Sequence, residues 1–142
     1  MLFVSITRLR IRSWRFLPPF FIYAFRTSKQ ASSASGNLSV AILREGFFTF
    51  WTRTTWTAEA SMKSYMISGA HGIAMRKLLN WCDEAAVVNW TQDSADLPSW
   101  PEAHRRMLQS GRPSKVKNPS PDQTAFRILP PVVAKTNDTR LK

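Results

Sequence analysis

Apolar and polar residues alternate along the first segment of the chain, residues 2–12, which reads LFVSITRLRIR. A period of two is typical of a β-strand, in which successive side chains point to opposite faces of the sheet. The odd-numbered residues from Phe3 to Ile11 share one face, and the even-numbered residues from Val4 to Arg10 share the other. The pattern therefore predicts a first strand with one mixed apolar face and one face that ends in arginines.

A helix and a hairpin follow in the pattern. Pro18 and Pro19 are tolerated in the first turn of a helix, so we expect a helix over residues 20–33. Residues 38–43 and 47–56 are rich in β-branched and aromatic side chains, and the link between them contains a glycine. These two runs predict a β-hairpin.

The second half of the chain continues with helical and strand patterns of different lengths. The expected elements are a long helix from a cap at Thr57 to about Asp83, a strand over 85–91, a short helix over 100–110 opened by a Ser99/Glu102 capping box, and a last strand over 124–129. The polar residues 134–142 are expected to form a flexible C-terminal tail.

The order strand, helix, strand, strand, helix, strand predicts an α+β fold of the ferredoxin-like βαββαβ type, with helices on one face of an antiparallel sheet. Residues 1–133 are expected to form one domain, since the chain of 142 residues has the usual size of one. The aromatic hairpin strand makes both sheet faces apolar. We therefore expect a homodimer that packs sheet against sheet, as in a dimeric α/β barrel.

The net charge of +11 is placed unevenly, because residues 1–44 contain no Asp or Glu. Arg8, Arg10 and Arg12 lie on one side of the first strand, and the favoured interpretation is a solvated or ligand-facing surface. Two alternatives stay open, an organelle transit peptide and an electrostatic surface for nucleic acid. The second predicts a basic nucleic-acid-binding protein and is the weaker functional hypothesis.

The single cysteine, Cys82, excludes a disulfide within the chain and is typical of a reducing compartment, so we expect a cytoplasmic protein. No run reaches the ~18 apolar residues that a membrane-spanning helix needs, and no membrane partner is expected. The run Cys82-Asp83-Glu84 has no histidine nearby, so no metal site is predicted.

His71 lies between Gly69 and Gly72 inside the long predicted helix. Each glycine costs a helix interior ~1 kcal/mol relative to alanine, so the pair indicates a kink or a close neighbour. In a straight helix, His71 is nearly opposite the apolar stripe that contains Met62 and Met66. A kink would bring it to a pocket edge, where it is the candidate catalytic residue; otherwise it is a hydrogen-bonded or surface histidine.

Aromatic residues beside polar ones mark a second candidate region. Alternation places Trp51 and Arg53 on one face of the second hairpin strand, an apolar wall with a cation that suits an acidic or polarised aromatic ligand. Trp90 beside Asn89 is a similar case in the following strand. Trp51, Arg53 and Trp90 are therefore the candidate ligand-binding residues, and the alternative is a core tryptophan beside a solvated arginine.

Four segments carry a resemblance to a known family: VSITRLRIRSW, FFTFWTRTTWTAEASM, SYMISGAHGIAMRKLLNW and AVVNWTQDSADLPSWPEAHRRMLQSGRPS. Over roughly residues 3–130 the chain resembles the dimeric α/β-barrel superfamily of antibiotic-biosynthesis monooxygenases, and more closely uncharacterised relatives of spheroidene monooxygenase. The resemblance implies a pocket between the sheet and the two long helices. Relatives include cofactor-free oxygenases and haem enzymes.

The leading hypothesis is therefore a monooxygenase-like oxidoreductase that oxidises a hydrophobic or aromatic small molecule, with His71 as a proton acceptor. A non-catalytic binder of a lipophilic ligand on the same fold is the alternative. No cofactor is predicted, because haem is not supported by a matched motif.

Overall fold

The computed structural model describes residues 1–134 and 137–142. Its helices are the 3₁₀ turn η1 (Trp14–Phe16), α1 (Leu17–Ser33), α2 (Glu59–Ile67), α3 (Gly69–Trp81), α4 (Trp100–Ser110) and α5 (Pro121–Ala125). Its strands are β1 (Leu2–Ile11), β2 (Asn37–Glu45), β3 (Thr49–Trp56), β4 (Cys82–Gln92), β5 (Arg112–Pro113) and β6 (Asp138–Arg140).

The strands form one antiparallel sheet in the order β5-β4-β1-β3-β2-β6. The first strand lies at the centre, where Ser5 pairs with Thr54 of β3 and with Asn89 of β4. The order of the longer elements is β1-α1-β2-β3-α2/α3-β4. The predicted α+β, ferredoxin-like arrangement is therefore confirmed.

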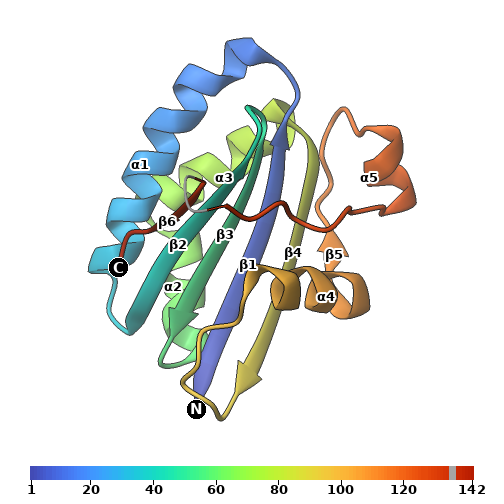
Figure 1. Cartoon of the computed structure of the whole chain (residues 1–142). Helices are drawn as coiled ribbons and strands as arrows, with labels where there is room; N and C mark the ends of the chain where they lie inside the picture. The colour runs from blue at the N-terminus through green and yellow to red at the C-terminus, as the bar shows by residue number, and fades with distance from the viewer. Residues whose placement is uncertain (135–136) are drawn as a thin grey trace.

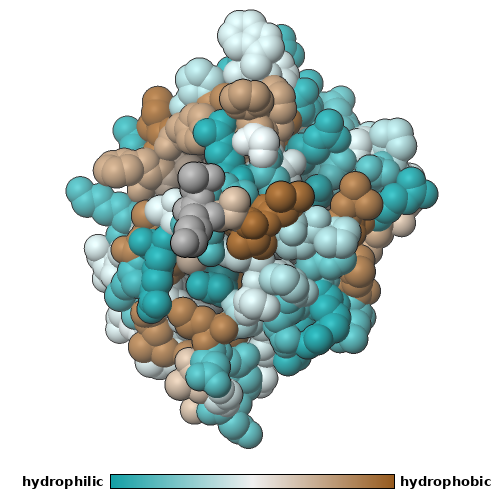
Figure 2. All heavy atoms as spheres, viewed as in Figure 1, coloured by the Kyte–Doolittle hydropathy of each residue, from teal (hydrophilic) through white to brown (hydrophobic). Residues whose placement is uncertain are grey.

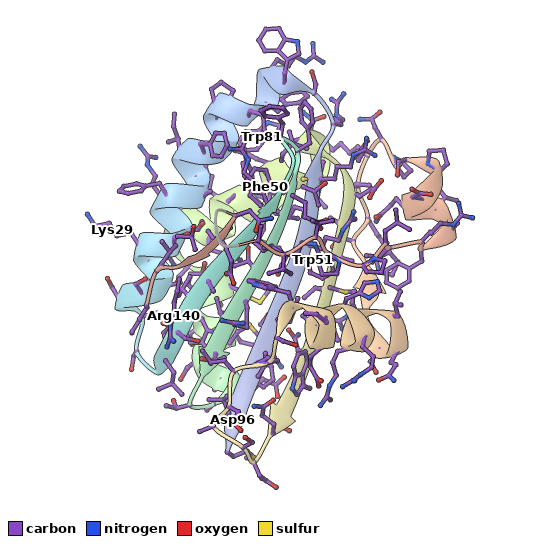
Figure 3. All side chains as sticks on the ribbon, in the orientation of Figure 1. Lys29, Phe50, Trp51, Trp81, Asp96 and Arg140 are labelled. Atoms are coloured by element: carbon purple, nitrogen blue, oxygen red, sulfur yellow. The ribbon has the colours of Figure 1, made fainter. Side chains whose placement is uncertain are left out.

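The two faces of the sheet are covered by different parts of the chain. Helices α1, α2 and α3 lie on one side, which we call the helix face, and α4 and the C-terminal segment cross the other, which we call the outer face (Figure 1). Consecutive residues of β3 alternate between them. Phe50 packs with residues of α1 and α3, whereas Trp51 packs with residues of α4 (Figure 3).

The outer face is closed by the chain itself. Trp51, Leu43 and Ile6 are fully buried there against Ala103 and Met107 of α4. On the side seen in Figure 2, hydrophobic residues occur in separate groups among hydrophilic ones. We expected a dimer because an apolar sheet face would otherwise lack a cover. Among the described residues, α4 supplies that cover on the outer face.

The C-terminal part differs most from the sequence-based expectation. The strand predicted over 124–129 is wrong, because residues 121–125 form α5. Ser120 Oγ accepts a hydrogen bond from the Gln123 backbone N–H (3.1 Å), and Phe126 ends the helix in a left-handed conformation (φ 51°). Residues 138–140, which we placed in the tail, form β6 and pair with Ala41–Leu43 of β2.

The arginines at the end of the first strand form hydrogen bonds with other residues of the chain. Arg8 and Arg10 each donate to the carboxylate of Glu84, at 2.8 Å and 2.9 Å, and Ser120 donates to the same group (2.8 Å). Arg12 donates to the Asn80 carbonyl (2.6 Å). These arginines are partners of internal acceptors, which favours the interpretation as a strand face over a nucleic-acid surface.

Within the ranges 1–134 and 137–142, no helix combines the length and apolar character needed to cross a membrane.

Candidate functional site

A cavity of about 400 Å³ lies between the helix face of the sheet and helices α1 to α3. This volume falls in the range of pockets that hold small organic molecules. Aromatic, aliphatic and methionine side chains from the three helices form most of its walls. They include Phe20, Phe21, Tyr23, Ala24, Met62, Tyr65, Met66, Met75, Leu78 and Leu79.

Hydroxyl groups form the middle of the cavity floor. Ser5 of β1 is paired with Thr54 of β3, and Thr7 is paired with Thr52, so the four side chains lie side by side on the helix face. Thr54 accepts a hydrogen bond from Trp56 Nε1 (2.9 Å). Among the described residues, the hydroxyls of Ser5, Thr7 and Thr52 have no such partner, which leaves them available to a polar group of a ligand.

The long predicted helix is broken in two at the cavity wall. Ser68 is extended (φ −111°, ψ 153°) and Gly69 is left-handed (φ 55°), so α2 ends at Ile67 and α3 starts in a new direction. Gly72 has the other role expected for these glycines, that of leaving room for a close neighbour. A Cβ at this position would lie 2.9 Å from the Ile67 carbonyl oxygen. One glycine permits the break and the other permits close packing across it.

The break places His71 in the cavity lining. Its Nδ1 lies 3.0 Å from the Met66 carbonyl oxygen, and its ring packs on Tyr65 with centroids 4.4 Å apart. A carbonyl only accepts, so Nδ1 carries the hydrogen and Nε2 is the basic nitrogen. Burial lowers the pKa of His71, and the Met66 carbonyl offsets part of this effect. The imidazole is therefore neutral at pH 7 and able to accept a proton.

Gln30 of α1 holds the two sides of the break together. Its Oε1 accepts from the His71 backbone N–H (3.0 Å), and its Nε2 donates to the carbonyl oxygens of Ser68 (2.8 Å) and Tyr65 (3.4 Å). These bonds satisfy backbone groups that the break leaves without helical partners. They also fix the first turn of α3, which carries His71, to α1.

The predicted ligand-binding residues lie on the outer face, away from this cavity. Trp51 is fully buried and its Nε1 donates to Glu45 (2.5 Å). Arg53 is 9% exposed, donates to the Pro98 carbonyl (2.7 Å) and packs over the Trp100 ring. Its burial lowers its pKa.

Trp90 lies on the same outer face, because it pairs with Val4 of β1. Its indole Nε1 donates to Gln92 (2.9 Å), and the Arg106 guanidinium packs on its ring. The structure thus brings His71 to the cavity and leaves Trp51, Arg53 and Trp90 outside it. A ligand-binding role for these three stays an untested prediction.

Two further groups of the sequence have no site of their own. Cys82 is fully buried, and burial together with the negative charge of Asp83 raises the pKa of its thiol to about 12, so it is unreactive at pH 7. In the part of the chain that the structure describes, no cluster of three or more His, Cys, Asp or Glu could hold a metal ion.

Sequence reasoning missed the hydroxyl floor and Arg44, the one arginine among the described residues of the cavity lining. Strand alternation did place Thr52 and Thr54 on the same face. Nothing in the alternation shows that this face is hollow, since that depends on how far the helices stand from it.

Solved structures from several organisms share this fold. Rv0793 from Mycobacterium tuberculosis matches with a TM-score of 0.60 and 10% identity, over 68% of this chain and 100% of that one. A protein from Nitrosomonas europaea, provisionally described as an antibiotic biosynthesis monooxygenase, matches with a TM-score of 0.57 and 13% identity, over 68% of this chain and 94% of that one. SnoaB, a cofactor-independent oxygenase from Streptomyces nogalater, matches with a TM-score of 0.53 and 16% identity, over 69% of this chain and 98% of that one.

The chain has the α+β fold of these three proteins. At such identities the likeness concerns the fold alone. No protein-family model and no curated protein matches the chain. The narrower resemblance to spheroidene monooxygenase stays a prediction.

Proposed function

We propose that the cavity binds a hydrophobic or aromatic small molecule and promotes its oxidation by dioxygen, with His71 as the proton acceptor. The observation that carries the proposal is the position of the His71 imidazole in the lining of an apolar cavity, where its Nδ1 contacts the Met66 carbonyl oxygen and its backbone N–H donates to Gln30. The fold supports it, since SnoaB, a cofactor-independent oxygenase, shares that fold.

An oxygenase without a cofactor must take all its electrons from the substrate. A CH₂ group flanked by aromatic rings meets this need, since R₂CH₂ + O₂ → R₂C=O + H₂O balances without another reductant. His71 Nε2 would accept the first proton, and the resulting carbanion would transfer electrons to dioxygen. The apolar walls exclude water from the reactive anion, and the hydroxyls of Thr7 and Thr52 would hydrogen-bond a polar group of the substrate.

The test follows oxygen uptake with anthrone, whose CH₂ group lies between two aromatic rings. The intact protein should accelerate uptake over buffer. His71→Gln should lower the rate by about a hundredfold, the usual size of a general-base contribution. His104→Gln is the matched control, because the other histidine lies on the outer face, where its Nε2 contacts the Ile128 carbonyl oxygen (2.8 Å). Equal rates for both variants would contradict the role of His71.

The pH dependence has a definite sign. The pKa of His71 is lowered, so the neutral base persists somewhat below the ordinary value of ~6.5. Enzyme-dependent uptake should therefore be constant around pH 7 and fall as the pH drops through the lowered pKa. An acid limb with an apparent pKa above that ordinary value would contradict the assignment.

Two other outcomes have specific meanings. Ligand binding without turnover of anthrone or of related substrates would favour the non-catalytic lipophilic binder. A Soret band in the purified protein would contradict a cofactor-free reaction.

The homodimer stays a prediction, and light scattering after size-exclusion chromatography measures it.

A further inference from the structure

Arg44 is the one arginine or lysine among the residues described as lining the cavity. It lies near the hairpin end of β2, where its register partner on β3 is Phe50. The guanidinium carbon lies 5.1 Å from the ring centroid of Phe21, 5.4 Å from that of Phe50 and 5.9 Å from that of Phe47. Aromatic rings thus hold the cation at the cavity without neutralising it.

The hydrogen-bonding capacity of Arg44 is largely unused. Nη2 donates to the Phe47 carbonyl oxygen (3.2 Å), whereas the buried Nε has no partner among the described residues. None of the ion pairs formed within residues 1–134 and 137–142 includes Arg44. The two remaining positions are Lys135 and Thr136, which carry no carboxylate. Buried polar groups normally have partners, and this Nε–H has none among the described residues. The buried Nε atoms of Arg8 and Arg53 also lack such a partner, but of the three residues only Arg44 lines the cavity, where a ligand could supply one.

The arginines of the outer face provide the contrast. Arg8 and Arg10 share the carboxylate of Glu84, and Arg53 donates to a backbone carbonyl. Among the described residues, Arg44 resembles Arg53 in having a backbone carbonyl and no acid as its partner, but Arg44 alone of these four arginines lines the cavity, whose described lining contains no Asp or Glu.

Helix α1 gives the separation between Arg44 and His71. Arg44 packs against Phe21 in the first half of α1, and His71 is bound through its backbone to Gln30, nine residues later. At 1.5 Å per residue these two positions are about 14 Å apart along the helix axis. The cation and the base therefore lie toward different ends of the cavity.

We propose that Arg44 binds an acidic group of the ligand, a carboxylate or another anion, and that the cavity selects elongated aromatic anions oriented with the acid at Arg44 and the reacting part near His71. This inference rests on the proposed function of the same cavity. Fork-shaped pairing of a guanidinium with a carboxylate-like anion supplies both affinity and orientation.

The test uses two fluorescent probes that differ by one anionic group, 8-anilinonaphthalene-1-sulfonate and the neutral N-phenyl-1-naphthylamine. Dissociation constants are measured for the wild type, Arg44→Met, Arg44→Lys and Arg26→Met. Arg26 is the matched control, since it also packs on an aromatic ring, that of Tyr23, but is exposed and lies outside the lining. Circular dichroism and the urea midpoint check that each variant is folded.

Arg44→Met should weaken the sulfonate probe about tenfold, as expected for the loss of one charge-assisted contact, and change the neutral probe less than about twofold. Arg44→Lys should retain part of the affinity, and Arg26→Met should match the wild type. Equal weakening of both probes, or an unchanged sulfonate affinity in Arg44→Met, would overturn the inference while leaving the binding cavity in place. Binding of neither probe to the wild type would remove both the cavity function and the inference.

Discussion

The two faces of one strand, β3, differ in what covers them. Trp51 and Thr52 are neighbours in the chain, yet Trp51 is fully buried under α4 whereas Thr52 faces a cavity of about 400 Å³. The outer face is filled with large side chains and paired charges. The helix face is lined with hydroxyls, a histidine and an arginine, and it is open to a ligand. The tryptophan and arginine that stand out in the sequence, Trp51 and Arg53, are therefore packed on the covered face, whereas serine and threonine residues line the cavity on the other.

The largest expected contrast between the faces is in stability. Trp51→Ala should lower the free energy of unfolding by about 4 kcal/mol, because it leaves a large hole in a packed core. Thr52→Ala should cost less than about 1 kcal/mol, because its side chain already borders empty space. Urea denaturation measures both. Similar losses for the two variants would mean that the helix face is packed as tightly as the outer face.

The charges of the outer face give a second, smaller effect. Glu84 is 3% exposed; burial alone would raise its pKa, but hydrogen bonds from Arg8, Ser120 and Arg10 lower it overall. Glu84→Gln should cost about 3 kcal/mol at pH 7, because it leaves the largely buried Arg8 guanidinium and the more exposed Arg10 guanidinium without their anion.

The pH dependence of that loss has a fixed sign. A lowered pKa means that the stabilisation is fully present above the unfolded value near pH ~4.3 and disappears as the pH falls through the folded value. The difference between wild type and Glu84→Gln should therefore shrink in acid. Glu59→Gln, in an exposed pair with Lys63 (3.1 Å), is the control and should cost less than about 1 kcal/mol at any pH. A wild-type advantage that grows in acid would be incompatible with this assignment.

The break between α2 and α3 can be tested with two glycines that share a left-handed conformation. Gly69→Ala should cost about 1–2 kcal/mol for its backbone and should also displace Gln30, since the new Cβ would lie 3.2 Å from Gln30 Oε1. Gly46→Ala has the same strain (φ 60°), but no atom lies within 4 Å of its Cβ. Only Gly69→Ala should change the NMR signals of the His71 ring. Unchanged ring signals would show that Gln30 does not position His71.

The smallest effect concerns the hydroxyl floor. Thr52→Val should change the free energy of unfolding by less than about 0.5 kcal/mol. It should also reduce the preference of the cavity for 1-naphthol over naphthalene about fivefold, the equivalent of one hydrogen bond of ~1 kcal/mol. Thr49→Val, on the outer face of the same strand, should leave the preference unchanged. Calorimetric titration measures the affinity of each variant for the two ligands.

Much of the fold could be predicted from sequence, because local patterns decide it. Strand alternation assigned Phe50 and Trp51 to opposite faces, and Ser99 caps α4 as predicted, accepting from the Glu102 backbone N–H (3.2 Å). The strand predicted over 124–129 failed because the cap at Ser120 outweighed a short alternating pattern.

The site was less predictable, because it depends on how later segments cover the sheet. The pair of glycines did indicate the break that brings His71 to the cavity. The choice of Trp51 as a ligand-binding candidate rested on its place beside Arg53 on one strand face, and strand alternation does not show that α4 covers this face. Arg44 gave no signal, since its lack of an acid partner is visible only in three dimensions.

The methionines allow the most direct test of the central claim, that ligands bind on the helix face. Met62, Met66 and Met75 line the cavity, whereas Met107 is fully buried in the outer-face core. In a titration of ¹³C-methyl-methionine protein with N-phenyl-1-naphthylamine, the three cavity signals should shift together and saturate while the Met107 signal stays in place. A shift of Met107 with static cavity signals would contradict the account.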